Sequence, residues 1–276
     1  MSLIHYKKSP IEYFFAALVL WLSVSTCAVA EEELSDLVPV IQKIKHLNWI
    51  TEEYPPFNYL DPKTGKTTGF SVELLLQIFT KLGISDQDIN IKMNPWARGY
   101  YKVLNEPGTA LFSTTYTEDR LQKMKFIGPI APNIIAVIAA KSSQLSIKSP
   151  SELNNLNIGV VREDIGEQLL IKQGINPESL DRLNSGLSMV KKLASGRIDA
   201  VGYAHATTQL LFRKAKINPD NFEIIYVLKH SAMGYTFHNS TDAKILETLS
   251  KALGELSVDG TLARLQAKYG LAAAHE

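Results

Sequence analysis

Short apolar runs alternate with longer segments of helical period along most of the chain, and this alternation restricts the fold more than any other feature. The runs rich in β-branched and aromatic residues are the expected strands, at 47–51, 89–93, 109–112, 134–139, 157–161, 200–203, 222–227 and 232–237. The segments of helical period are the expected helices, at 70–82, 165–173, 187–195 and 242–256. Strands that alternate with helices predict an α/β fold with a largely parallel sheet.

The first thirty residues have the composition of an export signal. Lys7 and Lys8 form a short positive region, residues 13–24 are apolar, and residues 28–30 supply an A-x-A pattern. We therefore expect cleavage near Ala30, a lead-in over residues 31–45 and a periplasmic mature protein. An uncleaved membrane anchor is one alternative, because residues 13–30 carry no charge over nearly the length that spans a bilayer. Lipidation of Cys27 is another, although the residues before it differ from typical lipoprotein signals.

Cleavage at that position would change both the cysteine content and the charge. It removes the one cysteine of the sequence and leaves 27 basic and 27 acidic residues. Disulfides within the mature chain are then excluded, so a core formed by about 240 residues must stabilise the fold. The charge is balanced, and no basic stripe with interleaved aromatic residues occurs, so we expect no nucleic-acid partner.

The usual catalytic and metal-binding motifs are absent from the sequence. The six histidines are scattered, and neither HExxH nor CxxC occurs, so no metal site is predicted. GxSxG, GxxxxGK[ST] and a strand-linked GxGxxG are also missing, which removes the commonest hydrolase, nucleotide and dinucleotide interpretations. We expect no cofactor and no catalytic activity.

Aromatic, hydroxyl and basic residues follow three of the expected strands. Tyr54 and Phe57 follow the first, Trp96 and Arg98 follow the second, and residues 113–120 follow the third. Each group by itself is also consistent with ordinary packing or an exposed surface position. Ligands of open α/β sheets bind at the carboxyl ends of strands, so the three groups together indicate a ligand site.

Several short motifs occur in an order that resembles one known family. They are Tyr54-Pro55-Pro56-Phe57, the T-G-F-S-V-E-L segment at 68–74, residues 113–120, S-G-R-I-D-A at 195–200, Asp259-Gly260-Thr261 and Lys268-Tyr269-Gly270. Over residues 47–270 the chain resembles the extracellular solute-binding proteins of ABC importers, family 3, the polar amino-acid type. The stretches at 95–100 and 126–130 resemble a less characterised branch of that family.

The resemblance implies a bilobal periplasmic-binding-protein fold of type II, with a mixed, mostly parallel sheet flanked by helices in each lobe. Residues 46–131 and 232–276 would form the first lobe, and residues 132–231 the second. The chain would cross between lobes near 130–134 and 228–232, where irregular segments interrupt the pattern. A small-molecule ligand would draw the lobes together by hinge closure. The expected partner is an ABC permease in the inner membrane, and the expected state is a monomer.

The resemblance also suggests roles for single residues. Arg120 matches the arginine that binds a ligand carboxylate, which suits its planar fork of donors. Thr115 matches the hydroxyl residue beside it, and Ser113 stands where the family has glycine. Tyr54 and Phe57 occupy positions of aromatic walls. We expect Trp96 to line the cleft, Arg98 to lie at its edge, and Tyr203 to contribute to the binding surface.

Two positions depart from the family pattern. Ala204 stands where an aspartate usually pairs with the ligand ammonium, and residues 162–166 are acidic where small hydroxyl residues are usual. Asp164 is thus a candidate partner for a ligand cation, and the alternative is an ordinary N-cap of the helix at 165–173, a position that aspartate strongly favours. We expect a ligand with an anionic end and a separate donor end, rather than the family's usual clamp on an α-amino acid.

These observations favour a periplasmic protein that captures a small polar or carboxylate-bearing, amino-acid-like metabolite and performs no chemistry. A dehydratase-like enzyme on the same fold is one alternative, with Glu163 or Asp164 as its general acid. A ligand-sensing subunit of a membrane receptor is the other. Resemblance of fold alone does not separate these functions.

Overall fold

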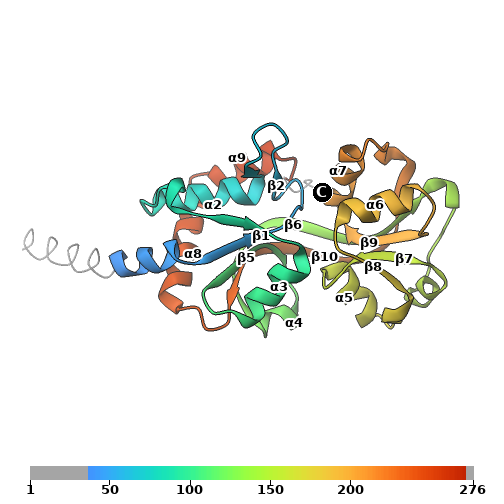
Figure 1. Cartoon of the computed structure of the whole chain (residues 1–276), viewed down its shortest axis with the longest axis horizontal. Helices are drawn as coiled ribbons and strands as arrows, with labels where there is room; N and C mark the ends of the chain where they lie inside the picture. The colour runs from blue at the N-terminus through green and yellow to red at the C-terminus, as the bar shows by residue number, and fades with distance from the viewer. Residues whose placement is uncertain (1–36, 272–276) are drawn as a thin grey trace, which may run out of the picture. The chain divides into compact units, whose positions relative to one another are not determined.

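The computed structural model describes residues 37–271 (Figure 1). Within them, the chain divides into two units at the boundary between residues 44 and 45. The expected leader over residues 1–30 lies outside the described residues. Residues 37–45 form a helix where the sequence predicted only a polar lead-in. In the described part, no helix is both long and apolar enough to cross a membrane. The sheet and the helices that cover it belong to the second unit.

Eight strands form one sheet in the order β4-β1-β5-β10-β6-β9-β7-β8. At one end lies the first strand set, which is parallel: β4 (Ile91–Met93), β1 (Asn48–Thr51) and β5 (Thr109–Thr115). At the other end lies the second strand set, also parallel: β9 (Ala200–Ala204), β7 (Ile158–Val161) and β8 (Leu180–Leu183). A separate hairpin pairs β2 (Tyr59–Leu60) with β3 (Thr67–Thr68).

Two long antiparallel strands, β6 (Met124–Ala140) and β10 (Phe222–His238), join the two sets (Figure 1). We expected irregular segments at 130–133 and 229–231 to interrupt the strands, but both lie inside these continuous elements. The irregularity is a series of register shifts, at Val227/Lys229 and Met233/Tyr235 among other points, which the backbone accommodates without leaving the sheet.

Helices cover the sheet at positions that the sequence largely predicted. The expected helices are α2 (Phe70–Lys81), α5 (Ile165–Lys172), α6 (Gly186–Ala194) and α8 (Ala243–Val258), each within two residues of the predicted ends. The others are α3 (Trp96–Asn105), α4 (Glu118–Leu121), α7 (His205–Lys214) and α9 (Thr261–Lys268). Short 3₁₀ turns occur at η1 (Asp86–Asp88), η2 (Lys141–Ser143), η3 (Pro150–Asn155), η4 (Pro177–Ser179) and η5 (Pro219–Asn221).

The elements that the sequence analysis missed have weak patterns. In β8 only Leu180 is buried, so this edge strand has no alternation of apolar and polar residues to reveal it. In α3 the buried residues Trp96, Tyr100 and Val103 have helical spacing, but the segment is short and Gly99 lowers its helix propensity. Leu111 lies where a side chain at Gly99 would be, which explains the glycine by close packing on β5.

The sheet topology brings the carboxyl ends of the two strand sets to face each other. Thr115, the last residue of β5, pairs with Met233, which pairs in turn with Ala131 of β6. Ala204, the last residue of β9, pairs with Ile135 of β6. Strand β9 is antiparallel to β6 and therefore runs in the direction opposite to β5. Ala131 and Ile135 are four residues apart, or about 13 Å along a strand. Side chains that follow both strand sets therefore converge beside the middle of β6.

Candidate functional site

A group of polar side chains fills this region of convergence, and we call it the buried polar cluster. Its members are Glu52, Tyr54, Thr115, Arg120, Asn133, Asp164, Tyr203 and Thr207. All are buried, although polar and charged side chains are uncommon at such depth unless they have partners. The cluster draws on the ends of β1, β5, β7 and β9, on the middle of β6, and on the helices that follow these strands.

Arg120 is the only cation of the cluster, and only 1% of its surface is exposed. It lies in α4, whose start is capped by the side chain of Thr117. The guanidinium carbon is 5.2 Å from the ring centroids of both Trp96 and Tyr100, in cation–π geometry. Nη1 donates to the backbone carbonyl of Thr115 at 3.2 Å, whereas Nε and Nη2 have no hydrogen-bond partner among the described residues.

Asn133 connects the end of β5 to the loop that follows β1. Its Nδ2 donates to Thr115 Oγ1 at 3.0 Å and to the Tyr54 hydroxyl at 3.4 Å. Tyr54 also contacts Tyr203 edge-on, with the ring centroids 5.5 Å apart. These contacts fix the orientation of the polar groups beside the middle of β6 before any ligand arrives.

Two carboxyl groups approach Arg120 from opposite strand sets. Glu52 directly follows β1 and is 8% exposed, and Asp164 precedes α5 and is 3% exposed. Burial raises the pKa of Asp164 to about 6, although the Arg120 charge and the N–H groups that begin α5 partly lower it. Burial, followed by the charge of Asp164, raises the pKa of Glu52 well above its ordinary value. The two carboxyls therefore disfavour each other's ionised form.

Asp164 occupies the N-cap position of α5, where the N–H groups of Ile165 and Gly166 favour its charged form, but neither of them meets the geometry of a capping hydrogen bond to its side chain. Its Oδ2 atom is buried without a hydrogen-bond partner among residues 37–271. The start of α5 lies very close to β9, because a side chain at Gly166 would collide with the carbonyl of Gly202. This close approach holds Asp164 against the strand that carries Tyr203.

The loop that carries Asp164 is held by its neighbours. Glu163 has a left-handed backbone conformation, with φ of 62°, and its carbonyl accepts a hydrogen bond from Trp96 Nε1 at 2.8 Å. Its side chain pairs with Arg182 at 3.2 Å, and Arg182 also pairs with the buried Glu167. The side chain of Glu163 is thus held in an ion pair with Arg182, whereas the side chain of Asp164 belongs to the buried polar cluster.

The second strand set also contributes hydroxyl groups. The Tyr203 hydroxyl and Thr207 Oγ1 are buried and have no hydrogen-bond partner in the described part of the chain. Burial, and then the charges of Glu52 and Asp164, raise the pKa of Tyr203 well above its usual value, so this hydroxyl stays protonated and can donate. Thr207 lies near the Tyr54 hydroxyl in the first turn of α7.

Three residues that the sequence predicted for the site lie outside the buried polar cluster. Ser113 of β5 has a left-handed backbone conformation, with φ of 63°. Its hydroxyl forms hydrogen bonds with Asn58 and Ser71, neither of which belongs to the cluster. Phe57 is fully buried and stacks on Tyr54, with the ring centroids 5.6 Å apart. Arg98 is exposed on α3, and no hydrogen bond or ion pair joins it to the cluster within residues 37–271.

Sequence reasoning missed Glu52, Asn133 and Thr207. Glu52 directly follows a strand and thus carried the same signal as Tyr54, but an exposed position is the more frequent one for glutamate. Asn133 gave no such signal, because it lies inside a strand that was expected to begin only at residue 134. Its place in the cluster depends on the pairing of β6 with both strand sets.

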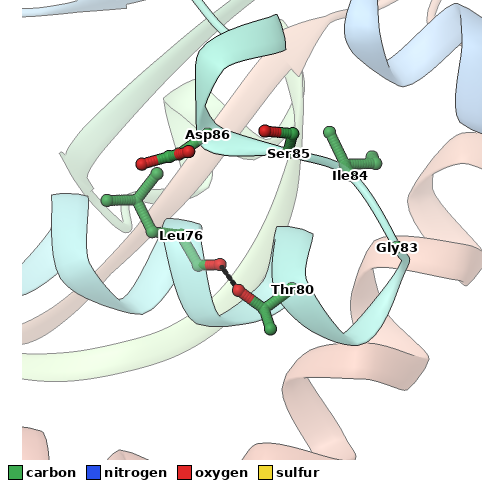
Figure 2. A pocket seen from close by; sticks show the side chains of 6 residues that line it. All are labelled: Leu76, Thr80, Gly83, Ile84, Ser85 and Asp86. Atoms are coloured by element: carbon green, nitrogen blue, oxygen red, sulfur yellow. Dashed lines mark hydrogen bonds between the residues drawn. The ribbon is translucent and has the colours of Figure 1, made fainter.

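Two other observations concern sites elsewhere in the described part. No group of three or more His, Cys, Asp or Glu side chains is arranged to hold a metal ion within residues 37–271. A surface hollow lies at the end of α2, where it is lined by Leu76, Thr80, Gly83, Ile84, Ser85 and Asp86 (Figure 2). The Thr80 hydroxyl donates to the Leu76 carbonyl there, and no member of the buried polar cluster lines this hollow (Figure 2).

A family model decides the identity of the chain. The model for bacterial extracellular solute-binding proteins, family 3, matches residues 47–272. The chain belongs to this family. The resemblance of the sequence motifs is thereby confirmed, and this solute-binding protein captures small-molecule solutes. The match includes every element that contributes to the buried polar cluster.

Curated relatives of this solute-binding protein include a binding protein and an enzyme. It is 24% identical over 216 residues to the L-cystine-binding protein TcyA of Bacillus subtilis. This match covers 78% of this chain and 77% of the relative. It is 25% identical over 275 residues to the membrane-bound lytic murein transglycosylase F of Photobacterium profundum. That match covers 94% of this chain but only 50% of the transglycosylase.

Solved structures confirm the periplasmic-binding-protein fold. An ancestral arginine-binding protein bound to arginine has a TM-score of 0.68 and 24% identity, over 81% of this chain and 98% of that one. A histidine kinase sensor domain similar to periplasmic binding proteins has a TM-score of 0.71 and 20% identity, over 82% of this chain and 96% of that one. At these identities the likeness establishes the fold alone.

Proposed function

We propose that this solute-binding protein works in the periplasm, where it captures an amino-acid-like ligand by its carboxylate and delivers it to an ABC permease of the inner membrane. The observation that carries the proposal is Arg120. Its guanidinium is buried at the ends of the strands, it is held against two aromatic rings, and two of its nitrogens remain available. A planar fork of fixed charge suits a carboxylate, which accepts two parallel hydrogen bonds.

The remaining polar groups would complete the contact surface. Thr115 lies beside Arg120 through the carbonyl contact, and Tyr203 offers a buried hydroxyl from the opposite strand set. We place residues 46–131 and 232–276 in one lobe and residues 132–231 in the other. Ligand binding would bring these lobes together, because the cluster combines residues from both. The monomeric state, the periplasmic location and cleavage near Ala30 belong to the same proposal.

The names of the relatives support an amino-acid ligand. Those names include L-cystine and arginine among the bound ligands, and a probable amino-acid ABC transporter-binding protein of Haemophilus influenzae is also among them. The transglycosylase match covers only half of that enzyme, so it does not by itself assign the enzyme's activity to this chain. We propose that this protein binds its ligand without converting it.

A thermal-shift screen of the mature protein against amino acids, small organic acids and polyamines tests this function. A ligand at a hundred times its dissociation constant adds about 2.7 kcal/mol to stability, which such a screen detects. Prolonged incubation with each hit, followed by mass analysis of the small molecule, separates a binding protein from an enzyme. If no carboxylate-bearing compound shifts the transition, or if a hit is converted, the proposal is wrong.

A further inference from the structure

We propose that Asn133 is a specificity-determining residue of the ligand site. Its amide oxygen accepts a hydrogen bond from the group on the carbon next to the ligand carboxylate, so the site binds α-hydroxy acids about as well as α-amino acids. This inference rests on the proposed function, since it assumes that Arg120 takes the carboxylate. It goes further by naming the residue that recognises the neighbouring group and a second class of ligand that follows from its chemistry.

The first argument is the orientation of the Asn133 side chain. Its Nδ2 donates to Thr115 Oγ1 at 3.0 Å and to the Tyr54 hydroxyl at 3.4 Å, so both amide hydrogens are used within the protein. Oδ1 is buried and has no hydrogen-bond partner among residues 37–271, although only 3% of the Asn133 surface is exposed. A buried acceptor is costly until a donor reaches it, so the amide is held ready for a donor.

A second buried asparagine shows what a purely structural role looks like. Asn58 uses both ends of its amide, because Nδ2 donates to the Glu52 carbonyl at 2.7 Å and Oδ1 accepts from the Ser113 hydroxyl. Asn133 uses only the donor end. The links to Thr115 and Tyr54 explain its Nδ2 and leave its Oδ1 without a role.

The next argument is the place of Asn133 in the sheet. It lies in β6 between Ala131 and Ile135. Ala131 is connected through β10 to the end of β5, and Ile135 pairs with the end of β9. The Asn133 side chain contacts Tyr54, whose ring contacts Tyr203 of the second strand set. A ligand held between the ends of the two strand sets therefore lies beside Asn133.

One residue holds both Asn133 and Arg120. The Thr115 carbonyl accepts from Arg120 Nη1 at 3.2 Å, and Thr115 Oγ1 accepts from Asn133 Nδ2 at 3.0 Å. In an α-amino or α-hydroxy acid, the amino or hydroxyl group is attached to the carbon next to the carboxylate. A carboxylate bound by Nε and Nη2 of Arg120 would therefore bring this group toward Asn133 Oδ1.

The last argument is that Asn133 accepts a hydrogen bond but carries no charge. An amide oxygen accepts equally from an ammonium N–H and from a hydroxyl O–H. Ala204, which ends β9 beside this part of β6, brings only a methyl group. Burial raises the pKa of Glu52 and of Asp164, which favours their neutral forms. Neither carboxyl is thus a fixed counter-charge that would reserve the site for an ammonium.

The test uses sets of three carboxylates that share one side chain and differ only in the group next to the carboxylate. In at least one set, isothermal titration of the mature protein should show the amino acid and the hydroxy acid binding within about fivefold of each other. Each should bind about tenfold or more tightly than the third compound, which leaves Oδ1 unpaired. The sets are L-alanine, L-lactate and propionate; L-aspartate, L-malate and succinate; L-leucine, L-leucate and isocaproate; L-phenylalanine, L-phenyllactate and hydrocinnamate; and L-arginine, L-argininate and guanidinovalerate.

Asn133→Leu tests the residue itself. Leucine has nearly the same size but no acceptor, so the amino acid and the hydroxy acid should lose about tenfold in affinity, and the third compound should change less than about threefold. A disturbance of Thr115 and Tyr54 would instead weaken all three compounds alike. Asn133→Ala removes the acceptor without adding an apolar group of that size, and it should give the same pattern.

Asn105→Leu is the matched control. Asn105 is exposed on α3, where its Nδ2 donates to the Tyr101 carbonyl at 2.7 Å, and it lies outside the buried polar cluster. The affinities for all three compounds of a set should therefore stay unchanged in this variant.

The possible results separate this inference from the proposed function. If the third compound of a set binds the parent as tightly as its amino acid, recognition by Asn133 is wrong and carboxylate capture stands. If the amino acid of every set that binds exceeds its hydroxy acid by more than about fivefold, the neutral acceptor is wrong. If Asn133→Leu and Asn133→Ala weaken all three compounds equally, or none of them, Asn133 is a structural residue and the inference fails. If no compound of any set binds the parent, both proposals are wrong.

Discussion

The residues that follow the two strand sets are organised differently. At the first set, Arg120 is held by two aromatic rings and a carbonyl, and Thr115 accepts a hydrogen bond from Asn133. At the second set, Asp164, Tyr203 and Thr207 each bury a polar atom that has no partner among the described residues. The first side thus presents a cation that contacts within the protein orient and that keeps two unpaired nitrogens, and the second side presents unpaired oxygen atoms toward the same region.

This difference suggests a division of roles in the ligand site. A preorganised arginine costs little ordering when a carboxylate binds, so the first side suits a group that many ligands share. Unpaired buried groups are costly until a ligand with matching donors or charges satisfies them, so the second side suits discrimination between ligands. Substitutions confined to one side should therefore have separable effects on ligand binding.

The largest effect is expected at the first side, from Arg120→Ala. This change removes the proposed partner of the carboxylate and should reduce the binding free energy of any amino-acid ligand by about 2–5 kcal/mol. Arg120→Lys should recover only part of it, because a point charge does not reproduce the planar fork or the contact with Trp96 and Tyr100. Titration calorimetry measures the loss, and Arg197→Ala, an exposed arginine, is the control. Unchanged affinity in Arg120→Ala would show that Arg120 does not bind the ligand carboxylate.

A second effect concerns the pH dependence of stability at the second side. The pKa of Asp164 in the folded protein is raised to about 6, so the folded state binds a proton there more tightly than the unfolded state does. The stability from this proton is fully present at low pH and is lost as the pH rises through about 6. Ligand-free protein should therefore gain on the order of 1–3 kcal/mol between pH 7.5 and pH 5 relative to Asp164→Asn.

Urea unfolding at the two pH values measures this difference. The charges of Arg120 and Glu167 act on Asp164, and those of Asp164, Arg120 and Glu53 act on Glu52. Because Asp164→Asn also removes the charge that raises the pKa of Glu52, the comparison reports on the two carboxyls together, and Glu52→Gln measured in parallel separates them. Asp164→Asn should also be the more stable protein at pH 7.5, because asparagine carries no buried charge. Parallel pH profiles for the two proteins would show that Asp164 titrates normally and that the second side is not strained.

A smaller effect is expected where the two sides meet, at Trp96. Its Nε1 donates to the Glu163 carbonyl at 2.8 Å, which joins α3 to the loop that carries Asp164. Trp96→Phe keeps an aromatic face for Arg120 but loses this hydrogen bond, so ligand affinity should fall about fivefold, corresponding to about 1 kcal/mol. Trp49 is the other tryptophan outside the expected leader and is buried in the core, so the ligand-induced change in tryptophan emission should disappear in this variant. An unchanged emission response in Trp96→Phe would show that Trp96 is not the residue whose emission changes when ligand binds.

Which cluster residues the sequence predicted, on either side, has a physical reason. Arg120, Thr115 and Tyr54 belong to motifs whose order and spacing are specific, and they lie within a few residues of strand ends. Asp164 was predicted from a departure from the family pattern, but its choice between capping and ligand binding depends on whether Oδ2 meets a backbone N–H, which no spacing reveals. Glu52 was missed because burial of a glutamate depends on contacts from distant segments.

The same limit applies to the fold. Helices with strong periodicity were predicted to within two residues, because each buries a continuous apolar face. The continuity of β6 and β10 was not predicted, since Pro129, Pro132 and the polar residues at 229–231 look like interruptions locally. Pairing along 17 residues of each strand overrides these local signals, and that pairing is what places Asn133 in the cluster.

The smallest effect should come from the pair between Lys214 and Glu53, which joins the end of α7 to the loop after β1. Both side chains are partly exposed, so water and salt screen their attraction, and ordering two long side chains offsets part of the gain. Lys214→Met should change ligand affinity by no more than about 0.5 kcal/mol, and the change should shrink further when ionic strength is raised to about 1 M. Titrations at low and high salt measure it. A loss comparable to that of Arg120→Ala would mean that contacts at the rim, rather than the buried polar cluster, hold the two strand sets around the ligand.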